Sequence, residues 1–324
     1  MSPRRTSRQG RNPRTKGTRP GTHVPVLLGQ VLRIADPQPG QTVADCTLGY
    51  GGHAVRIAQR IGKTGHLVGL DLDGRQLEKT AGRLEQLPPK ISLHHRNYAE
   101  LPDVMAAERI SGFDLILADL GVSSMQIDDE GRGIGYATDG PLDMRMDAQA
   151  GIPTGADLLA EMPATELAGA LADLSDEPDA VTIAQWIVNQ RQALPIATTG
   201  QLVRLVLAAK GLTEKTWKKS EKSGYGKFHP AARTFQALRI LVNDELASLQ
   251  RLLEALPDCL ARGGRVMVIS FQPGEDRLVR SAFQAGLEEG LYCRINREAI
   301  TPSGKEIHRN WRASSGRLRW ALRA

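Results

Sequence analysis

The 324-residue sequence has few cysteines, few aromatic residues and no long apolar run. Its cysteines, Cys46, Cys259 and Cys293, are far apart and odd in number, which argues against a disulfide framework and against a structural metal site. No apolar segment approaches the roughly 18 residues that a membrane span needs, and the N-terminus lacks the apolar core of a secretory leader. We therefore expect a cytoplasmic protein that neither binds a metal nor contacts a membrane.

The excess of positive charge lies largely at one end of the chain. The net charge is +6, and residues 1–20 contain seven basic and no acidic residues. A segment this rich in Pro, Gly and Arg cannot bury a core, so residues 1–21 are predicted to be a basic disordered tail. Two interpretations stay open: a solvated leader, or an arm that binds RNA phosphates with an affinity that falls steeply with salt.

From residue 41 the sequence alternates short apolar strands with amphipathic helices. A helix is predicted over 53–61, and a second helix begins after Asp73, which is a suitable N-cap residue. The predicted strands of this part are 42–45, 66–70, 91–93 and 113–117. This alternation indicates an α/β fold, with a mostly parallel sheet and helices on both of its faces.

The alternation stops after residue 125 and returns near residue 231. Between them we predict helices over 156–174, 180–190 and 200–209, followed by an exposed linker over 213–227. The α/β pattern then resumes with the predicted helices 231–256 and 278–285 and the predicted strands 265–271, 292–297 and 317–322. We infer one α/β domain over 22–135 and 228–324, interrupted by a mainly helical substrate-recognition domain over 136–227.

Three of the predicted strands end on or near carboxylates, at Asp45, Asp71 and Asp119. Ligands of open parallel sheets bind at the carboxyl ends of the strands. The glycines of the loop 49–53 allow close approach of a ligand to the backbone, and the helix N-terminus behind them favours an anionic group.

Asp71 lies 22 residues after Gly49, where a carboxylate can accept both hydroxyls of an adenosine ribose. The alternative is an exposed carboxylate that merely ends a strand. A ribose at this place fits either a dinucleotide or S-adenosylmethionine. Because the dinucleotide fingerprint G-x-G-x-x-G is incomplete, the pattern favours the methyl donor.

Four longer motifs resemble those of one family of bacterial methyltransferases. They are Asp45–His53, Asp119–Gln126, Gly140–Asp147 and His229–Arg239. Together they resemble the RsmH (MraW) family, and the likeness covers roughly residues 22–322. The resemblance implies a class I S-adenosylmethionine-dependent methyltransferase with a Rossmann-like fold. Its expected reaction is methylation of the N4 amine of a decoding-site cytosine in 16S ribosomal RNA, within the small ribosomal subunit, and no DNA partner is expected.

The resemblance also implies which residues bind the cofactor. They are Gly51, Gly52, His53, Asp71, Tyr98, Asp119 and Gln126. The two glycines and His53 would line the methionine end, Asp71 would hold the ribose, and Tyr98 would lie against the adenine. The other two residues would complete the pocket.

Asp119 is the candidate catalytic residue. The lone pair of a cytosine N4 amine is delocalised into the ring, so methyl transfer is chiefly a matter of positioning the amine in line with the methyl group. An acceptor on the N–H would also stabilise the developing positive charge. Two roles stay open for Asp119: orienting the target amine, or only binding the cofactor.

Arg145, His229 and Arg233 are the candidates for substrate binding. Ordinary salt bridging is the alternative for Arg233, and capping of the helix that follows is the alternative for His229. With aromatic residues at 4% of the chain, few side chains can stack on an extruded base. The candidates for stacking are Tyr136, Trp217 and Tyr225, whereas the helical spacing of Trp186 with Ile183 and Ile187 indicates a core residue. For a further basic cluster the alternative is a solvated face, and this cluster consists of Lys215, Lys218, Lys219, Lys222 and Lys227.

The sequence departs from the family pattern at the predicted RNA side. Gln272, Pro273 and Gly274 stand where the family tends to have His, Ser and Leu, and Trp311 stands where Pro is common. The region 132–136 is also looser than usual. Two other functions stay open as alternatives. A nicotinamide-dependent oxidoreductase would need the missing fingerprint, and a non-catalytic RNA-binding assembly factor would transfer no methyl group.

Overall fold

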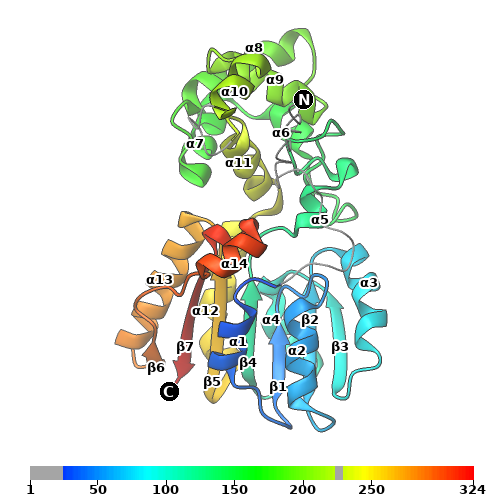
Figure 1. Cartoon of the computed structure of the whole chain (residues 1–324), viewed down its shortest axis with the longest axis vertical. Helices are drawn as coiled ribbons and strands as arrows, with labels where there is room; N and C mark the ends of the chain where they lie inside the picture. The colour runs from blue at the N-terminus through cyan, green and yellow to red at the C-terminus, as the bar shows by residue number, and fades with distance from the viewer. Residues whose placement is uncertain (1–24, 223–228) are drawn as a thin grey trace, which may run out of the picture.

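The computed structural model describes residues 25–222 and 229–324. The predicted tail over 1–21, together with Tyr225, Lys227 and the side chains of Lys219 and Lys222, lies outside the described residues. The described chain forms an α/β lobe and, above it in Figure 1, a lobe made of helices. None of the helices in the described ranges is long and apolar enough to cross a membrane.

The α/β lobe is built on one seven-stranded sheet with the order β3-β2-β1-β4-β5-β7-β6. Only β7 runs against its neighbours, and all the other pairings are parallel. The strands are β1 (Thr42–Asp45), β2 (His66–Asp71), β3 (Lys90–His95), β4 (Phe113–Asp119), β5 (Leu260–Ser270), β6 (Tyr292–Ile295) and β7 (Arg317–Arg323). The predicted α/β fold with a mostly parallel sheet is confirmed.

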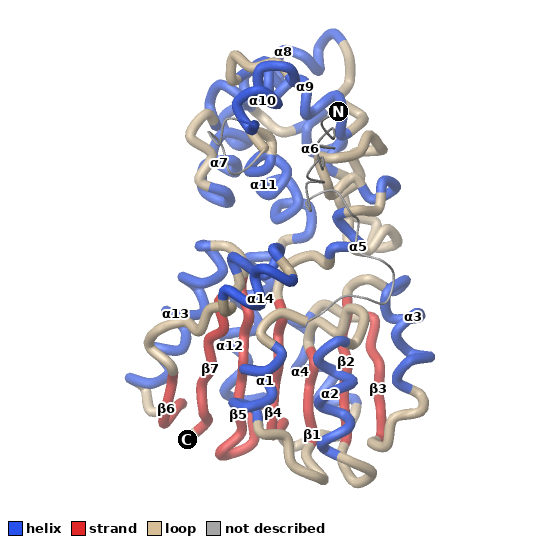
Figure 2. Tube along the Cα trace, in the orientation of Figure 1, coloured by secondary structure: helices blue, strands red, loops and turns tan. Residues whose placement is uncertain are grey.

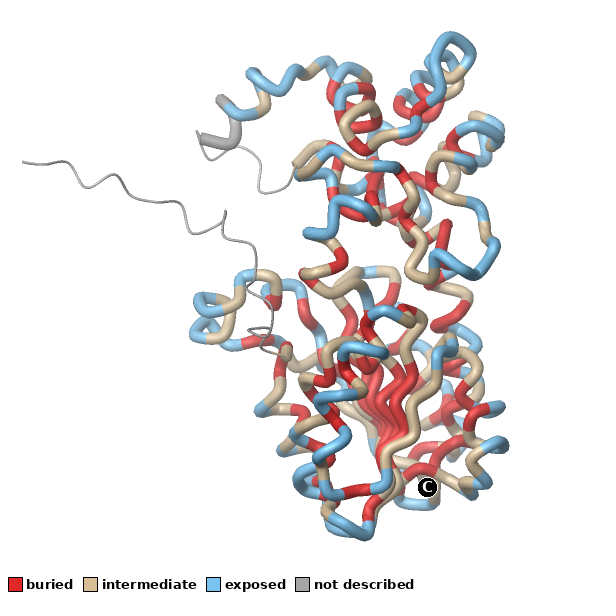
Figure 3. The backbone as a smooth tube through the Cα atoms, turned by 90° about the vertical axis from the view of Figure 1, so that its right-hand side faces the viewer, coloured by how far each residue is buried: buried red, intermediate tan, exposed pale blue. Residues whose placement is uncertain are grey.

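Helices cover both faces of the sheet (Figure 2). One face carries α1 (Leu28–Ala35) and α2 (Gly52–Ile61), with α3 (Gly74–Leu84) at its side, and the other carries α4 (Leu101–Ala107), α12 (Glu245–Cys259) and α13 (Pro273–Glu288). Alternate residues of β4 pack against the helices on opposite faces of the sheet, because successive side chains of a strand point to opposite faces. Leu115 and Leu117 pack with α2, and Ile116 and Ala118 pack with α12. The strands are therefore buried between the two layers, as Figure 3 shows.

The helical lobe contains α6 (Gly155–Glu161), α7 (Ala164–Ser175), α8 (Ala180–Ala193), α9 (Thr199–Ala209), α10 (Glu214–Lys222) and α11 (Ala232–Asn243). One hydrophobic cluster joins these helices and includes Leu167, Ile187, Leu202 and Leu238. Because Leu238 belongs to α11, this core continues past residue 227. The division of the chain into domains at that residue stays a prediction.

Several helix boundaries differ from those predicted. The predicted helix over 231–256 is two helices, because Asp244 between them adopts a left-handed conformation with φ 48° and ψ 42°. The predicted helix over 156–174 is interrupted at Pro163, which precedes α7. The segment 213–227, expected to be an exposed linker, contains α10.

The prediction of Trp186 as a core residue is wrong. Its side chain is 46% exposed, while Ile183 and Ile187 are fully buried. Successive helical residues are rotated by about 100° around the axis, so Trp186 lies beside the buried stripe of α8 and not on it.

Candidate active site

The three strand-end carboxylates lie together at the carboxyl edge of the sheet, which faces the helical lobe (Figure 1). Asp45 ends β1, and the neighbouring strands β2 and β4 end at Asp71 and Asp119. We call these three residues the acid edge. The spatial order of the strands, β2-β1-β4, brings them together although 74 positions separate Asp45 from Asp119 in the sequence.

Asp71 organises the glycine loop. Its Oδ2 accepts a hydrogen bond from the backbone N–H of Gly49 at 2.6 Å, and its Oδ1 accepts one from the N–H of Asp73 at 2.8 Å. Burial raises the pKa of Asp71 to about 6, although both backbone N–H groups act in the opposite direction. Each oxygen of the carboxylate still has a second lone pair with which to accept a ligand hydroxyl.

The glycines at 51 and 52 are required for different reasons. Gly51 precedes α2 with φ 72°, a conformation that favours glycine. A Cβ at Gly52 would lie 2.5 Å from Cγ of Pro25, so packing against Pro25 alone demands a glycine there. No side chain of the described chain caps α2, and its first N–H groups are suited to a carboxylate.

His53 and Asp119 place unpaired polar atoms next to each other in the interior. His53 is 5% exposed, and its Nε2 lies 3.5 Å from Oδ2 of Asp119. Neither ring nitrogen of His53 nor Oδ1 of Asp119 has a hydrogen-bond partner within the described ranges. Buried polar atoms are nearly always hydrogen-bonded, so this cluster fits a site that binds a polar ligand.

Asp45 adds a third polar group to this cluster. Burial raises its pKa to about 7, and the negative charges of Asp119 and Asp71 act in the same direction. His53 and the backbone N–H of Thr47 oppose that shift. Thr47 also links two strands, because its Oγ1 accepts a hydrogen bond from the N–H of Asp119 at 2.6 Å.

Asp73 forms a network that the sequence analysis missed. Its N-cap role is confirmed, since it accepts hydrogen bonds from the first N–H groups of α3. It also accepts a hydrogen bond from Nε2 of Gln126 at 3.0 Å and pairs with Arg132 at 2.7 Å. Burial is the largest influence on the Asp73 pKa and acts to raise it, but the bonds to Gln76, Arg132 and Gln126 hold it below its usual range. The network fastens the chain after β4 to the end of β2.

Gln126 and Tyr98 both have protein partners. Gln126 lies in α5 (Ser124–Ile127), and its Oε1 accepts a hydrogen bond from the N–H of Ser123 at 2.8 Å. Tyr98 begins the short helix η2 (Tyr98–Glu100), and its hydroxyl donates to the carbonyl oxygen of Glu245 at 3.1 Å. Burial raises the pKa of this phenol well above its usual range. Tyr98 is thus held against α12 at the end of β3.

The three predicted substrate-binding residues make local contacts. Arg145 binds both carboxylate oxygens of Asp143, at 2.7 and 2.9 Å. Arg233 donates to the carbonyl oxygen of Asp176, and Nδ1 of His229 accepts the N–H of Ala231 at the start of α11. None of these contacts reaches the acid edge.

Two of the predicted stacking residues gather around His229. The rings of Tyr136 and His229 are stacked with their centroids 4.7 Å apart, and the ring of Trp217 meets His229 edge-on at 5.6 Å. Gln272, one of the departures from the family pattern, accepts a hydrogen bond from Gln236 of α11 at 2.9 Å. Gln272 therefore ties α13 to the helical lobe.

Comparison with known proteins gives matches along nearly the whole chain. Residues 21–324 match the MraW methylase family. The chain belongs to this family. Ribosomal RNA small subunit methyltransferase H 1 of Lachnoclostridium phytofermentans is 40% identical over 315 residues, covering 95% of this chain and 84% of that protein. Ribosomal RNA small subunit methyltransferase H of Acidobacterium capsulatum is 40% identical over 306 residues, covering 92% and 97%.

A solved structure of an rRNA methylase from Streptococcus thermophilus is 10% identical, with a TM-score of 0.41, and the match covers 90% of this chain and 91% of that chain. Membership of the MraW family and the seven-stranded, mostly parallel sheet identify the protein as a class I methyltransferase with a Rossmann-like fold. Its cofactor is S-adenosylmethionine. The described part of the chain holds no group of three or more His, Cys, Asp or Glu side chains arranged to bind a metal.

Proposed function

We propose that this MraW family protein transfers a methyl group from S-adenosylmethionine to the N4 amine of a decoding-site cytosine in 16S ribosomal RNA. The assembled small ribosomal subunit in the cytoplasm is the proposed substrate. The names of the relatives support ribosomal RNA as the substrate. The main structural support for methyl transfer is the acid edge beside the glycine loop, where buried atoms of His53 and Asp119 without hydrogen-bond partners lie close together.

The residues around the glycine loop fit the two ends of the cofactor. Asp71 would accept the ribose hydroxyls, because its carboxylate is already fixed by the N–H groups of Gly49 and Asp73. Gly51, Gly52 and His53 would receive the methionine end at the start of α2. When bound, the cofactor supplies a methyl group that is electrophilic because it is attached to a sulfonium sulfur.

The outer part of the pocket would be formed by Tyr98 and Gln126. Tyr98 lies at the end of β3 and is fixed by Glu245, so its ring can form one wall of an adenine site. Gln126 is bonded to Asp73 and Ser123. We therefore assign Gln126 a positioning role, in which it holds the α5 segment against the cofactor site.

Asp119 would orient the target amine. Its Oδ1 is buried without a partner in the described chain, and its backbone is fixed by Thr47. A carboxylate that accepts one N–H of the amine directs the nitrogen lone pair toward the methyl group and stabilises the positive charge that develops there. His53, 3.5 Å from Asp119, would help to fix the carboxylate.

The contacts of the predicted substrate residues indicate how each would act on RNA. His229 presents a ring already stacked on Tyr136, which is a surface suited to an extruded base. Arg145 is paired with Asp143, so its effect on RNA would be mainly to shape the loop. The exposed Arg233 lies on α11 in the helical lobe and would contact a phosphate.

The test is methyl transfer to small subunits from cells in which the gene is deleted. Purified protein is incubated with these subunits and labelled S-adenosylmethionine, and label in the ribosomal RNA is measured. We expect label in the RNA of deletion-strain subunits and none in that of wild-type subunits, which are already methylated. Binding without transfer would instead identify an assembly factor, and calorimetric binding of NAD but not S-adenosylhomocysteine would identify an oxidoreductase.

A further inference from the structure

An exposed tryptophan lies at the carboxyl edge of the sheet. Trp311 begins the short helix η4 (Trp311–Ser315) and is 55% exposed. The guanidinium carbon of Arg312 lies 5.5 Å from the centroid of its ring. We call these two residues the Trp311 platform. A large aromatic ring left this exposed, with a cation against it, is suited to stack on a flat, electron-rich group.

The backbone under the Trp311 platform is firmly anchored. Ala313 is fully buried in the same hydrophobic cluster as Val26 and Leu27. The preceding helix α14 (Gly304–Arg309) is fastened to α1 by Glu306, which accepts a hydrogen bond from the N–H of Leu27 at 2.6 Å. Trp311 is therefore presented on a fixed support, which reduces the entropy lost when it binds a partner.

The same anchors place the platform beside the active site. Arg312 pairs with Asp128 at 3.0 Å, and Asp128 directly follows α5, the helix that carries Gln126. On the other side, Pro25 packs on Gly52 of the cofactor loop, two residues before Leu27. Figure 1 shows α14 above the ends of the strands, next to the helical lobe.

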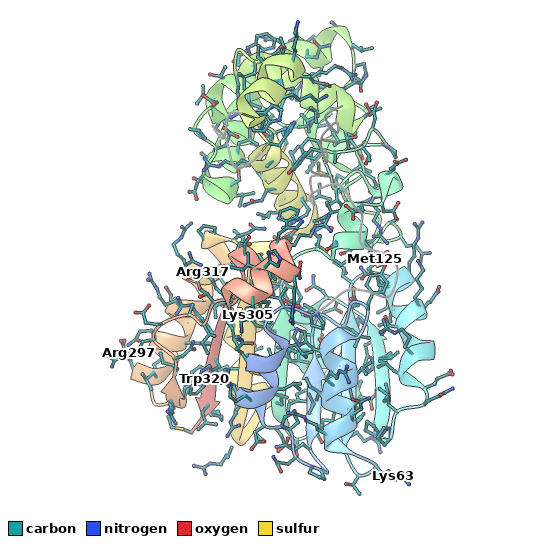
Figure 4. All side chains as sticks on the ribbon, viewed as in Figure 1. Lys63, Met125, Arg297, Lys305, Arg317 and Trp320 are labelled. Atoms are coloured by element: carbon teal, nitrogen blue, oxygen red, sulfur yellow. The ribbon has the colours of Figure 1, made fainter. Side chains whose placement is uncertain are left out.

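The surface around the platform is basic. The last 28 residues contain seven Lys and Arg but only two acidic residues. Lys305, His308 and Arg309 of α14 are all exposed, and neither Lys305 nor Arg309 has an ion-pair partner in the described part of the chain. Arg317, also exposed, lies beside α14 (Figure 4), but its guanidinium pairs with Asp276 at 3.1 Å.

We propose that the Trp311 platform and the exposed cations of α14 form an RNA-binding surface, in which an unpaired base of the substrate RNA stacks on Trp311 and the adjoining phosphates contact Lys305 and Arg309. This inference rests on the proposed function, because it takes RNA as the substrate. A stacked aromatic ring and flanking cations are the combination by which proteins hold single-stranded nucleic acid. The surface would hold RNA next to the nucleotide that is methylated.

The experiment compares four variants of the full chain, one of which replaces Lys305 and Arg309 together by Ala. Trp311→Ala removes the ring, and Trp311→Phe keeps an aromatic face. Trp186→Ala is the matched control, because Trp186 is 46% exposed but lies on α8. For each, the affinity for protein-free 16S ribosomal RNA, kcat, and KM for deletion-strain small subunits are measured. Binding of S-adenosylhomocysteine is measured by calorimetry to show that the cofactor site is intact.

We expect Trp311→Ala to weaken RNA binding by roughly 5- to 150-fold, the range for loss of one stacked base. KM for subunits should rise correspondingly while kcat changes little, and Trp311→Phe should recover most of the affinity. Replacing Lys305 and Arg309 together by Ala should reduce the slope of log affinity against log salt by about one to two. Trp186→Ala should change none of these.

Two results would overturn the inference. One is unchanged RNA affinity and KM in Trp311→Ala. The other is weaker binding of Trp311→Ala to subunits together with unchanged binding to protein-free RNA, which would identify a protein partner. Failure of the proposed function would be recognised separately, because wild-type protein would then transfer no methyl group to ribosomal RNA. The direct RNA-binding measurement would still decide whether Trp311 contacts RNA.

Discussion

Replacing Asp45 by Asn should stabilise the protein without its cofactor, and more so at high pH. Asp45 is 2% exposed at the end of β1, and burial raises its pKa from 3.8 to about 7. Because the pKa of Asp45 is higher in the folded protein than in the unfolded chain, the protein keeps its full stability below the unfolded pKa near 4. It loses stability as the pH rises from there through 7, since the buried carboxyl group must then ionise. Raising the pKa by about three, at roughly 1.36 kcal/mol for each pKa unit, lowers the unfolding free energy of the wild-type protein by about 4 kcal/mol at pH 8.

Asn retains the carbonyl oxygen that can accept the N–H of Thr47, which Asp45 binds at 3.2 Å, but it cannot ionise. The gain in unfolding free energy should therefore be about 4 kcal/mol at pH 8 and about 2 kcal/mol at pH 5. Urea unfolding followed by circular dichroism at both pH values measures it. Asp36→Asn, at an exposed carboxylate after α1, is the matched control and should show no such difference. A gain for Asp45→Asn that is equal at both pH values would refute the reasoning.

Three other substitutions test the site. Asp71→Asn should weaken S-adenosylhomocysteine binding in calorimetry by about 10- to 100-fold, because a charged hydrogen-bond acceptor is lost; unchanged affinity would remove Asp71 from the ribose site. Asp119→Asn should slow single-turnover transfer at saturating cofactor at least about tenfold, and a full rate would exclude an electrostatic role at the amine. Arg132→Met should lower the unfolding free energy by about 3 to 5 kcal/mol, since buried Asp73 loses its ion-pair partner; a loss under about 1 kcal/mol would contradict this.

The sheet was predictable because its signals are local. Each central strand is a short apolar run, and those of β1, β2 and β4 end on an acid. The glycine loop and the N-cap Asp73 are equally local signals, and so the sequence alone locates the carboxyl edge. The identity of the methylated base, in contrast, rests on the resemblance to the RsmH (MraW) family and on no spacing rule.

The parts that could not be predicted depend on contacts between distant residues. The hydrogen bond between Asp73 and Gln126 joins positions 53 residues apart, and no pattern in one sequence reveals such a pair. The break between α11 and α12 requires a left-handed Asp244, although the helical periodicity continues through it. The wrong prediction for Trp186 has a similar cause, because helical periodicity locates the buried face of a helix only to within about one residue.

The activity proposed for this protein is methylation of one cytosine on its exocyclic amine. It is tested most directly by digesting ribosomal RNA from deletion-strain small subunits after incubation with the protein and S-adenosylmethionine, and analysing the fragments and nucleosides by mass spectrometry. We expect one added methyl group, in a single decoding-site fragment, recovered as a cytidine methylated at N4. A methyl group on another atom, another base or another region of the RNA would contradict it.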